Sequence, residues 1–215
     1  MNLFDYLAGN ANQIIFLIQQ HLEVVLISVG VATVIGVGLG FLSESRPALR
    51  QVSLAVTGIF LTLPSYAIFA LLIPLLGLGA GPTLVGLIIY GIFPILQNTV
   101  TGIAGVDPAV IDAARGLGMG RKRRLFAIIL PLAWPVILSG IRVATIILVA
   151  IAAIAAAVNG PGLGKLIFTG LARIGGANAL NEVLTGVIGV VLVATILELL
   201  FILIAKLTTP RGLHA

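Results

Sequence analysis

The sequence predicts an all-α membrane protein with five transmembrane helices, and three observations support this prediction. Of the 215 residues, 60% are hydrophobic and only 9% are charged, and the mean hydropathy is +1.22. A soluble domain usually carries about 25% charged residues. The third observation is that the apolar residues gather into stretches long enough to cross a bilayer, which needs about 20 residues in a helix. The chain therefore belongs to the multi-pass membrane class.

The predicted spans form a single transmembrane domain, residues 1–215. They cover residues 22–42, 54–76, 83–103, 135–158 and 183–205. The second span contains Pro64 and Pro74. Either proline can kink it, because proline lacks an amide donor and crowds the preceding turn. Glycines recur inside the spans, as expected where helices pack closely in lipid.

Basic residues predict the orientation, because Lys and Arg concentrate in cytoplasmic loops. One set of loops holds nine of them: Arg46, Arg50, Arg115, Arg121, Lys122, Arg123, Arg124, Lys206 and Arg211. The opposite side holds two, Lys165 and Arg173. The larger set is therefore placed in the cytoplasm, with the N-terminus outside and the C-terminus inside.

The same loops explain the net charge of +5, so we expect no nucleic-acid partner. The chain has two His and no Cys, and it shows no cluster of His, Asp, Glu, Ser or Cys at a common depth, as a membrane-embedded enzyme would need. We therefore expect no catalytic residues, no metal site and no cofactor.

The cytoplasmic loop of residues 104–134 has an internal pattern of its own. Asp107 can cap a helix and Pro108 suits its first turn, which predicts a short helix over residues 108–117 that is ended by Gly118 and Gly120. Ala113 and Ala114 would give it a small surface that another protein can approach closely. An interfacial helix with basic residues near anionic lipid is the alternative interpretation.

Seven residues in this loop follow a fixed spacing: Asp112, Ala113, Ala114, Gly118, Ile128, Leu130 and Pro131. This pattern resembles the cytoplasmic "EAA" signature of permease subunits in ATP-binding-cassette importers, with Asp112 in place of the usual Glu. The resemblance implies a type I importer-permease core with a cytoplasmic coupling helix. It also implies that these seven residues couple the chain to a separate ATPase, and that the protein lies in a bacterial cytoplasmic membrane.

Further stretches resemble the permeases of osmoprotectant importers, which take up glycine betaine, choline or carnitine. They include residues 62–65, 90–99, 101–103, 106–108, 116–119, 130–133, 140–142 and 159–164. The resemblance implies an importer of compatible solutes, with a permease of a methionine or other amino-acid importer as the alternative. A stand-alone secondary carrier or channel is the alternative of another class. Five spans without a visible repeat fit such a carrier poorly.

The resemblance also implies the partners. The chain lacks the Gly-x-x-x-x-Gly-Lys-[Ser/Thr] phosphate loop, so the ATPase must be a separate subunit. An extracytoplasmic solute-binding protein would deliver the solute to the outer face. A second permease chain, identical or related, would complete the path through the membrane lipid.

A few polar and small residues are candidates for the remaining roles. Candidate path residues are Pro64, Ser65, Asn98 and Thr99, although Asn98 and Thr99 also suit helix packing. Candidate contacts of the binding protein are Asn159, Gly160, Gly162 and Gly164, for which a plain turn is the alternative.

Charged residues near the spans have structural interpretations. We expect Glu198 to make a hydrogen bond between helices, since an intramembrane carboxylate is costly when unpaired. Arg142 is expected to snorkel or to pair with a neighbour. His21 is expected at the membrane interface.

Overall fold

The computed structural model of the protein describes residues 2–209, so Arg211, one of the basic residues used for orientation, lies outside the described part. The helices are α1 (Leu3–Gly9), α2 (Ala11–Ser43), α3 (Pro47–Thr62), α4 (Ser65–Leu76), α5 (Ala80–Ala104), α6 (Pro108–Gly116), α7 (Arg121–Arg124), α8 (Leu130–Ile154), α9 (Gly164–Ala172) and α10 (Ala179–Thr208). A π-helical turn, η1 (Leu125–Ile129), joins α7 to α8, and a 3₁₀ turn, η2 (Ala155–Val158), follows α8.

Four continuous helical stretches are long and apolar enough to cross a membrane: Ala11–Ser43, Ala80–Ala104, Arg121–Val158 and Ala179–Thr208. Each contains one of the predicted spans and extends beyond it at one or both ends. The fifth crossing exists only if α3 and α4 count together, because they are bent by 100°. The predicted span over residues 54–76 is therefore a broken helix, and the break lies at Pro64, one of the two prolines expected to kink it.

The break between α3 and α4 has a local cause at Pro64. A proline disfavours helical geometry in the residue before it, and Leu63 is extended, with φ −73° and ψ 144°. The hydroxyl of Tyr90, on α5, donates a hydrogen bond to the carbonyl oxygen of Leu63. One of the carbonyls released by the break is thereby satisfied. Pro74 lies inside α4 without ending it.

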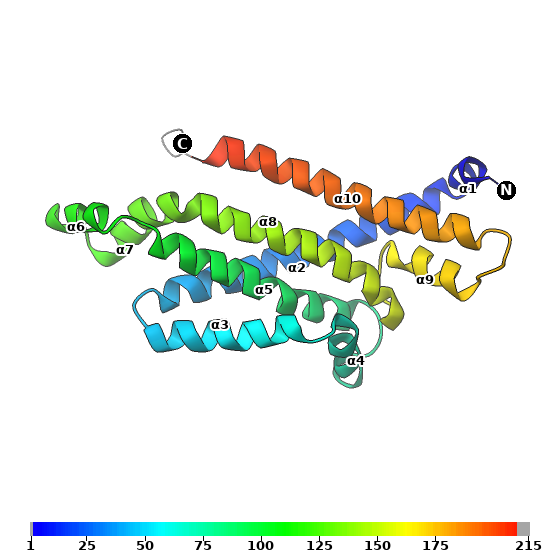
Figure 1. Ribbon diagram of the computed structural model, residues 1–215, viewed down its shortest axis with the longest axis horizontal. Helices are drawn as coiled ribbons and strands as arrows, with labels where there is room; N and C mark the ends of the chain where they lie inside the picture. Colours follow the sequence, from blue (N-terminus) through cyan, green and yellow to red (C-terminus); the bar gives the residue numbers. More distant parts are fainter. Residues whose placement is uncertain (1, 210–215) are drawn as a thin grey trace.

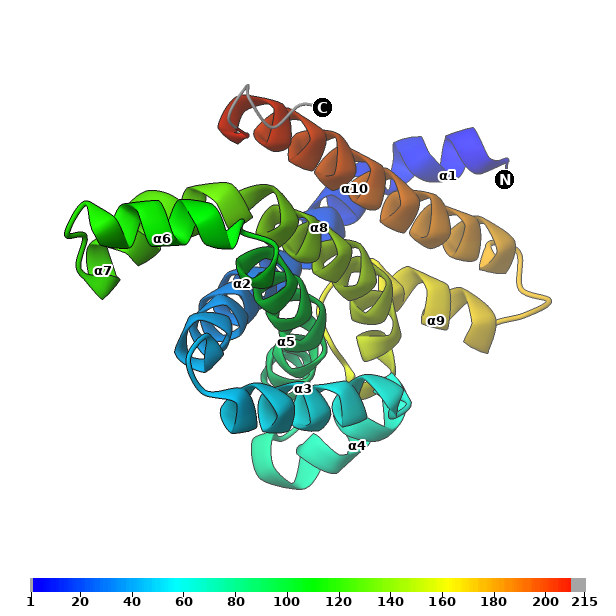
Figure 2. The ribbon, with the colours of Figure 1, turned by 60° about the vertical axis from the view of Figure 1, so that its left-hand side comes forward.

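The centre of the fold is a three-helix packing of α2, α5 and α8. The arm formed by α3 and α4 packs on one side of this centre, and α10 with α9 lies on the other (Figure 2).

Glycines allow the close contacts between the central helices. A Cβ at Gly40 would lie 2.4 Å from Cγ2 of Thr99, and one at Gly140 would lie 2.5 Å from Cβ of Asn98. Larger side chains at these two glycines would therefore separate α5 from α2 and from α8.

The molecule has two distinct ends along its long axis. Helices α6 and α7 and the α2–α3 turn lie at one end, and α1 and α9 lie at the other (Figure 1). The chain starts at the α1 end, and the last turn of α10 points toward the α6 end. The two described ends of the chain thus lie toward opposite ends of the bundle, as an odd number of crossings requires.

Candidate functional site

Helix α6 begins as the sequence predicts. The side chain of Asp107 accepts a hydrogen bond of 2.8 Å from the backbone N–H of Ala109, and Pro108 occupies the first turn. Proline is favoured there because its missing N–H would have no partner in the helix anyway. The predicted cap is therefore confirmed, and it fixes where the chain turns out of α5 into α6.

The end of α6 explains the position of Gly118. The N–H of Met119 bonds the carbonyl of Ala114 at 3.1 Å, and the N–H of Gly118 bonds that of Arg115 at 3.0 Å. This pair of bonds is the Schellman motif, which needs a left-handed residue just after the helix. Gly118 supplies it with φ +76°. The four-residue spacing from Ala114 to Gly118 is thus the spacing of a helix end.

The two signature alanines face different ways. Ala113 is exposed, whereas Ala114 is buried with 4% of its surface accessible, on a helix that packs against α7 and η1. The expectation that both form the approachable surface is therefore wrong for Ala114. Its small side chain instead lets α6 lie close to the segment that follows it.

An apolar stripe lies on the outer side of α6. Val110 is 40% exposed and Leu117 is 79% exposed, and together with Ala113 they follow the i, i+3, i+7 spacing of one helix face. The signature includes neither Val110 nor Leu117, although their spacing was visible in the sequence. On another side of α6, Asp112 and Arg115 form an exposed ion pair of 3.2 Å, which adds little to stability.

The second half of the signature coincides with an irregular helix. Ile128 lies inside η1, and Leu130 and Pro131 begin α8. The N–H of Leu130 bonds the carbonyl of Leu125, five residues back, and Pro131 has no N–H to continue the regular ladder. Single π-turns of this kind are frequent at functional sites. Here the π-turn joins the segment after α6 to a membrane-spanning helix.

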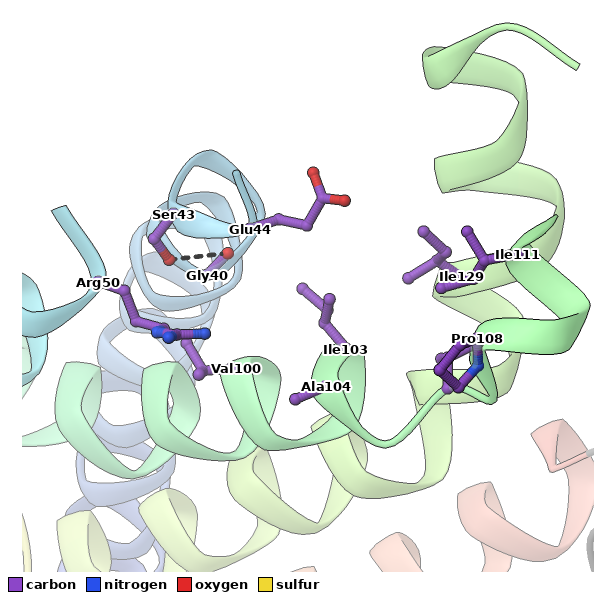
Figure 3. Close-up of a pocket in the computed structure, with 11 residues that line it drawn as sticks. Gly40, Ser43, Glu44, Arg50, Val100, Ile103, Ala104, Pro108, Ile111 and Ile129 are labelled. Carbon is purple, nitrogen blue, oxygen red and sulfur yellow. Dashed lines mark hydrogen bonds between the residues drawn. The ribbon is translucent and has the colours of Figure 1, made fainter. Parts of the chain in front are cut away.

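A cleft of about 260 Å³ separates α6 and η1 from the ends of α2 and α5. Figure 3 shows Pro108, Ile111 and Ile129 on one side and Glu44 and Arg50 on the other. Ile103 lies between the two sides (Figure 3). Helix α6 is therefore held to the bundle mainly through the chain and not by broad packing.

The four candidate path residues separate into two pairs. Pro64 is exposed and Ser65 half-buried at the α3–α4 break. Asn98 packs against Gly140 of α8 and bonds the carbonyl of Pro94. Thr99 is fully buried against Gly40 of α2, and its hydroxyl bonds the carbonyl of Ile95. Asn98 and Thr99 thus have the packing geometry that was the alternative interpretation.

Other polar residues lie on the free side of α5 and α8, away from α2. Gln97 and Thr101 of α5 are exposed, and so is Ser139 of α8. Asn98 and Gly140, their neighbours in sequence, form the α5–α8 contact, so these three residues flank that seam. Sequence analysis named Asn98 and not Gln97, and only the packing shows that Gln97 is the exposed residue of the two.

The outward sides of other spans differ from this face in composition. Exposed residues on α2 include Leu26, Val31 and Val34, and those on α10 include Val191 and Leu199. These are side chains suited to lipid. Gln97, Thr101 and Ser139 are therefore exposed polar residues in a part of the fold where α2 and α10 mostly expose apolar side chains.

The glycine-rich segment after η2 is mostly buried. Gly160, Gly162 and Gly164 are buried, whereas Asn159 is exposed in a left-handed conformation with φ 59°. A Cβ at Gly164 would lie 2.0 Å from the carbonyl oxygen of Ala153. The three glycines thus serve close backbone packing, and Asn159 alone of the four predicted contacts is open to a partner.

This packing also corrects the expectation for His21. His21 is fully buried, and its Nε2 lies 3.1 Å from the carbonyl oxygen of Val149. A Cβ at Gly162 would lie 2.8 Å from its Nδ1. The imidazole is therefore enclosed by α8 and the glycine-rich segment and is not exposed at the surface of the protein.

A polar pocket of about 370 Å³ opens at the α1 end of the molecule. It is lined by Tyr6, Asn10, Gln13, Lys165, Leu166, Thr169, Arg173, Asn178 and Glu182. Arg173 and Glu182 approach to 3.6 Å across it. Burial raises the pKa of the Tyr6 hydroxyl, and the Glu182 carboxylate adds to the rise. Among residues 2–209, no group of three or more His, Cys, Asp or Glu is placed to hold a metal ion.

Residues 32–211 match the model of the family described as the binding-protein-dependent transport system inner membrane component. The osmoprotectant import permease protein OsmW of Salmonella typhimurium is 34% identical over 219 residues, covering 100% of both chains. The choline transport system permease protein OpuBB of Bacillus subtilis is 32% identical, covering 99% of this chain and 96% of the relative. A structure of the methionine transporter MetNI in an inward-facing conformation superposes with a TM-score of 0.81 at 22% identity, covering 92% of this chain and 96% of that chain.

Proposed function

Because the chain belongs to the family of inner membrane components of binding-protein-dependent transport systems, we propose that it is the permease of an importer for compatible solutes. The expected substrates are glycine betaine, choline or carnitine. Support comes from full-length relatives above 30% identity that are named as osmoprotectant and choline permeases. The similarity to the MetNI structure, at 22% identity, supports the fold and not the substrate.

We propose that the ATPase docks on the apolar stripe of α6, and one observation supports this proposal. A capped helix projects from one end of the bundle, with Val110, Ala113 and Leu117 on its outer side. An apolar helix face that is exposed among residues 2–209 suits a groove in another protein. The ATPase pair would move α6 when it closes on ATP, and the spans would change between two states.

The solute path is placed along the free face of α5 and α8. Gln97, Thr101 and Ser139 are exposed there, and polar side chains within spans usually face a bundle interior or a water-filled cavity. The α3–α4 break contributes Pro64 and Ser65, since irregular backbone at membrane depth is tolerated where it lines a cavity. Asn98 and Thr99 would act through helix spacing.

A second permease chain would cover this face. Lipid cannot satisfy the amide of Gln97, whereas a facing copy, or a related chain, would enclose the polar strip between the two permeases. The opposite arrangement, with α2 or α10 at the interface, would leave the polar strip in hydrocarbon.

The solute-binding protein is assigned to the α1 end. The polar pocket with Lys165, Arg173 and Glu182 lies there, as does the exposed Asn159. This assignment follows the predicted orientation, in which α6 and the basic residues around it are cytoplasmic.

Purification of the complex from its host in mild detergent tests this proposal. The expected result is recovery of an ATPase and a binding protein, with the binding protein stabilised against heat by glycine betaine, choline or carnitine. Stabilisation by methionine instead would contradict the substrate group and favour the amino-acid alternative. Reproducible recovery of the intact chain without any ATPase would contradict the coupled importer.

A further inference from the structure

Arg121 connects two parts of the chain that are distant in sequence. It is the first residue of α7, shortly after the end of α6. Its Nη2 donates to Oε2 of Glu44 at 2.9 Å and to Oγ of Ser45 at 2.6 Å. Glu44 and Ser45 form the turn between α2 and α3. One guanidinium thus joins the segment after the coupling helix to the turn that leads into the bent arm.

This link spans the two sides of the cleft beside α6. Glu44 lines the cleft on the α2 side, opposite Ile111 of α6 and Ile129 of η1. In Figure 3 the Glu44 side chain extends from the end of α2 toward the helical segment that carries Ile129. Because α6 packs mainly on α7 and η1, the chain itself connects it to α5 and α8. Through the contacts of Arg121, the segment after α6 is also connected to the α2–α3 turn.

The turn held by Arg121 leads directly into the α3–α4 arm. Helix α3 begins at Pro47, two residues after Ser45, and packs on α5, where Phe93 meets Gly58. The far end of α3 is held to α5 by the Tyr90 hydrogen bond at Leu63. Helix α3 is therefore held near its start by the contacts of Arg121 and at its end by the contact of Tyr90. A displacement of the α2–α3 turn would move α3 and so reach the break at Pro64.

We propose that Arg121 is a positioning residue that transmits movement of the coupling helix to the α2–α3 turn and so to the broken span. The inference rests on the proposed function, because it assumes that an ATPase moves α6. The Arg121 side chain is 61% exposed and that of Glu44 is 25% exposed. An exposed pair of this kind adds little to folding stability, so its loss should affect the transmission and not the fold.

The neighbouring basic residues supply a matched control. Lys122 and Arg123 are exposed, and neither is among the ion-paired residues in the described part of the chain. Lys122→Ala removes the same charge from the same short helix without touching the link. A general effect of charge near the membrane would appear in Lys122→Ala as well as in Arg121→Ala.

The test uses the complete complex in proteoliposomes, with radiolabelled glycine betaine and choline as probes. Uptake and ATP hydrolysis are measured together. Removing one coupling contact typically changes coupling by between about twofold and thirtyfold, so Arg121→Ala and Glu44→Gln should lower the solute taken up per ATP within that range. The charge-swapped pair Glu44→Arg with Arg121→Glu should recover most of the loss, and Lys122→Ala should behave as the unmodified complex.

Two results would overturn the inference. One is an unchanged uptake per ATP in both Arg121→Ala and Glu44→Gln, while the unmodified complex couples normally. The other is an equal loss in Lys122→Ala. An unmodified complex that hydrolyses ATP without uptake of either probe would instead sink the proposed function, and this inference with it.

Discussion

Arg142 of α8 and Glu198 of α10 form a two-point ion pair inside the membrane-spanning part of the fold. Nε of Arg142 lies 2.8 Å from Oε2 of Glu198, and its Nη2 contacts the other carboxylate oxygen. The predicted helix–helix hydrogen bond of Glu198 and the pairing of Arg142 are therefore confirmed as a single contact. Most of α10 otherwise presents apolar side chains outward, so this pair fixes which side of α10 meets α8.

Breaking this pair from one side should destabilise the protein more than removing both partners. Glu198→Leu leaves the Arg142 charge unpaired in the membrane, at a cost of up to about 2.5–3.5 kcal/mol. The double variant Arg142→Leu with Glu198→Leu should recover most of that loss, because no charge remains. Unfolding in detergent measures both. A double variant less stable than Glu198→Leu alone would contradict this interpretation.

Gly118→Val should disrupt the end of α6. A β-branched residue in the left-handed region costs at least about 1–2 kcal/mol, so the Schellman bonds to Ala114 and Arg115 should be lost. Recovery of the ATPase with the permease should fall roughly tenfold, the factor that 1.4 kcal/mol gives. Gly120→Val is the matched control, because Gly120 has φ −63° and a Cβ at this position would meet nothing within 4 Å. An equal loss of ATPase recovery in both variants would contradict the claim that the left-handed backbone at Gly118 is what matters.

Leu117→Asp should weaken ATPase docking without unfolding the permease. Leu117 is 79% exposed, so the charge stays in water in the free chain but would be buried against the ATPase. Loss of a hot-spot residue near the centre of an interface costs at least about 2 kcal/mol. ATPase recovery in detergent measures the effect. Leu180→Asp, at a leucine that is 69% exposed at the other end of the bundle, should leave recovery unchanged.

Cysteine labelling can distinguish a polar path from a lipid-facing surface, because the chain has no native cysteine. Gln97→Cys on the free face of α5 should react with a water-soluble maleimide in the assembled complex. Thr195→Cys, on the exposed side of α10, should not react, because lipid surrounds it. Comparable labelling of the two variants would contradict the placement of the path.

The predicted orientation has its own labelling test. Gly120→Cys, between α6 and α7, should react with a membrane-impermeant maleimide only after the cells are opened. Labelling from outside intact cells would reverse the orientation inferred from the basic loops. The α6 end would then face the outside, and the proposed sites of the ATPase and of the binding protein would be wrong.

Hydropathy predicted where the chain crosses the membrane, since long apolar runs have few alternatives. The sequence named Pro64 and Pro74 as possible kinks, but it did not show that Pro64 breaks the helix while Pro74 stays inside α4. A proline can kink a helix or end it, and the hydrogen bond from Tyr90 to the freed carbonyl of Leu63 comes from a helix distant in sequence. Helix α9 was also missed, because its nine residues are too few for a span.

Side-chain direction was the harder part of the site. The signature correctly marked α6, and Asp107 and Gly118 fixed its ends. Whether Ala113 or Ala114 faces outward depends on the packing of α6 against η1. In the same way, Gln97 and Asn98 differ only in which of them meets Gly140. Such choices arise from contacts between helices distant in sequence, and a single sequence does not display them.

The most direct test of the central claim is solute uptake by the reconstituted complex with its binding protein on the α1 side. With ATP supplied on the α6 side, we expect glycine betaine or choline to accumulate, and uptake should cease when ATP or the binding protein is omitted. Accumulation driven by an ion gradient without ATP would contradict the account and favour a stand-alone carrier.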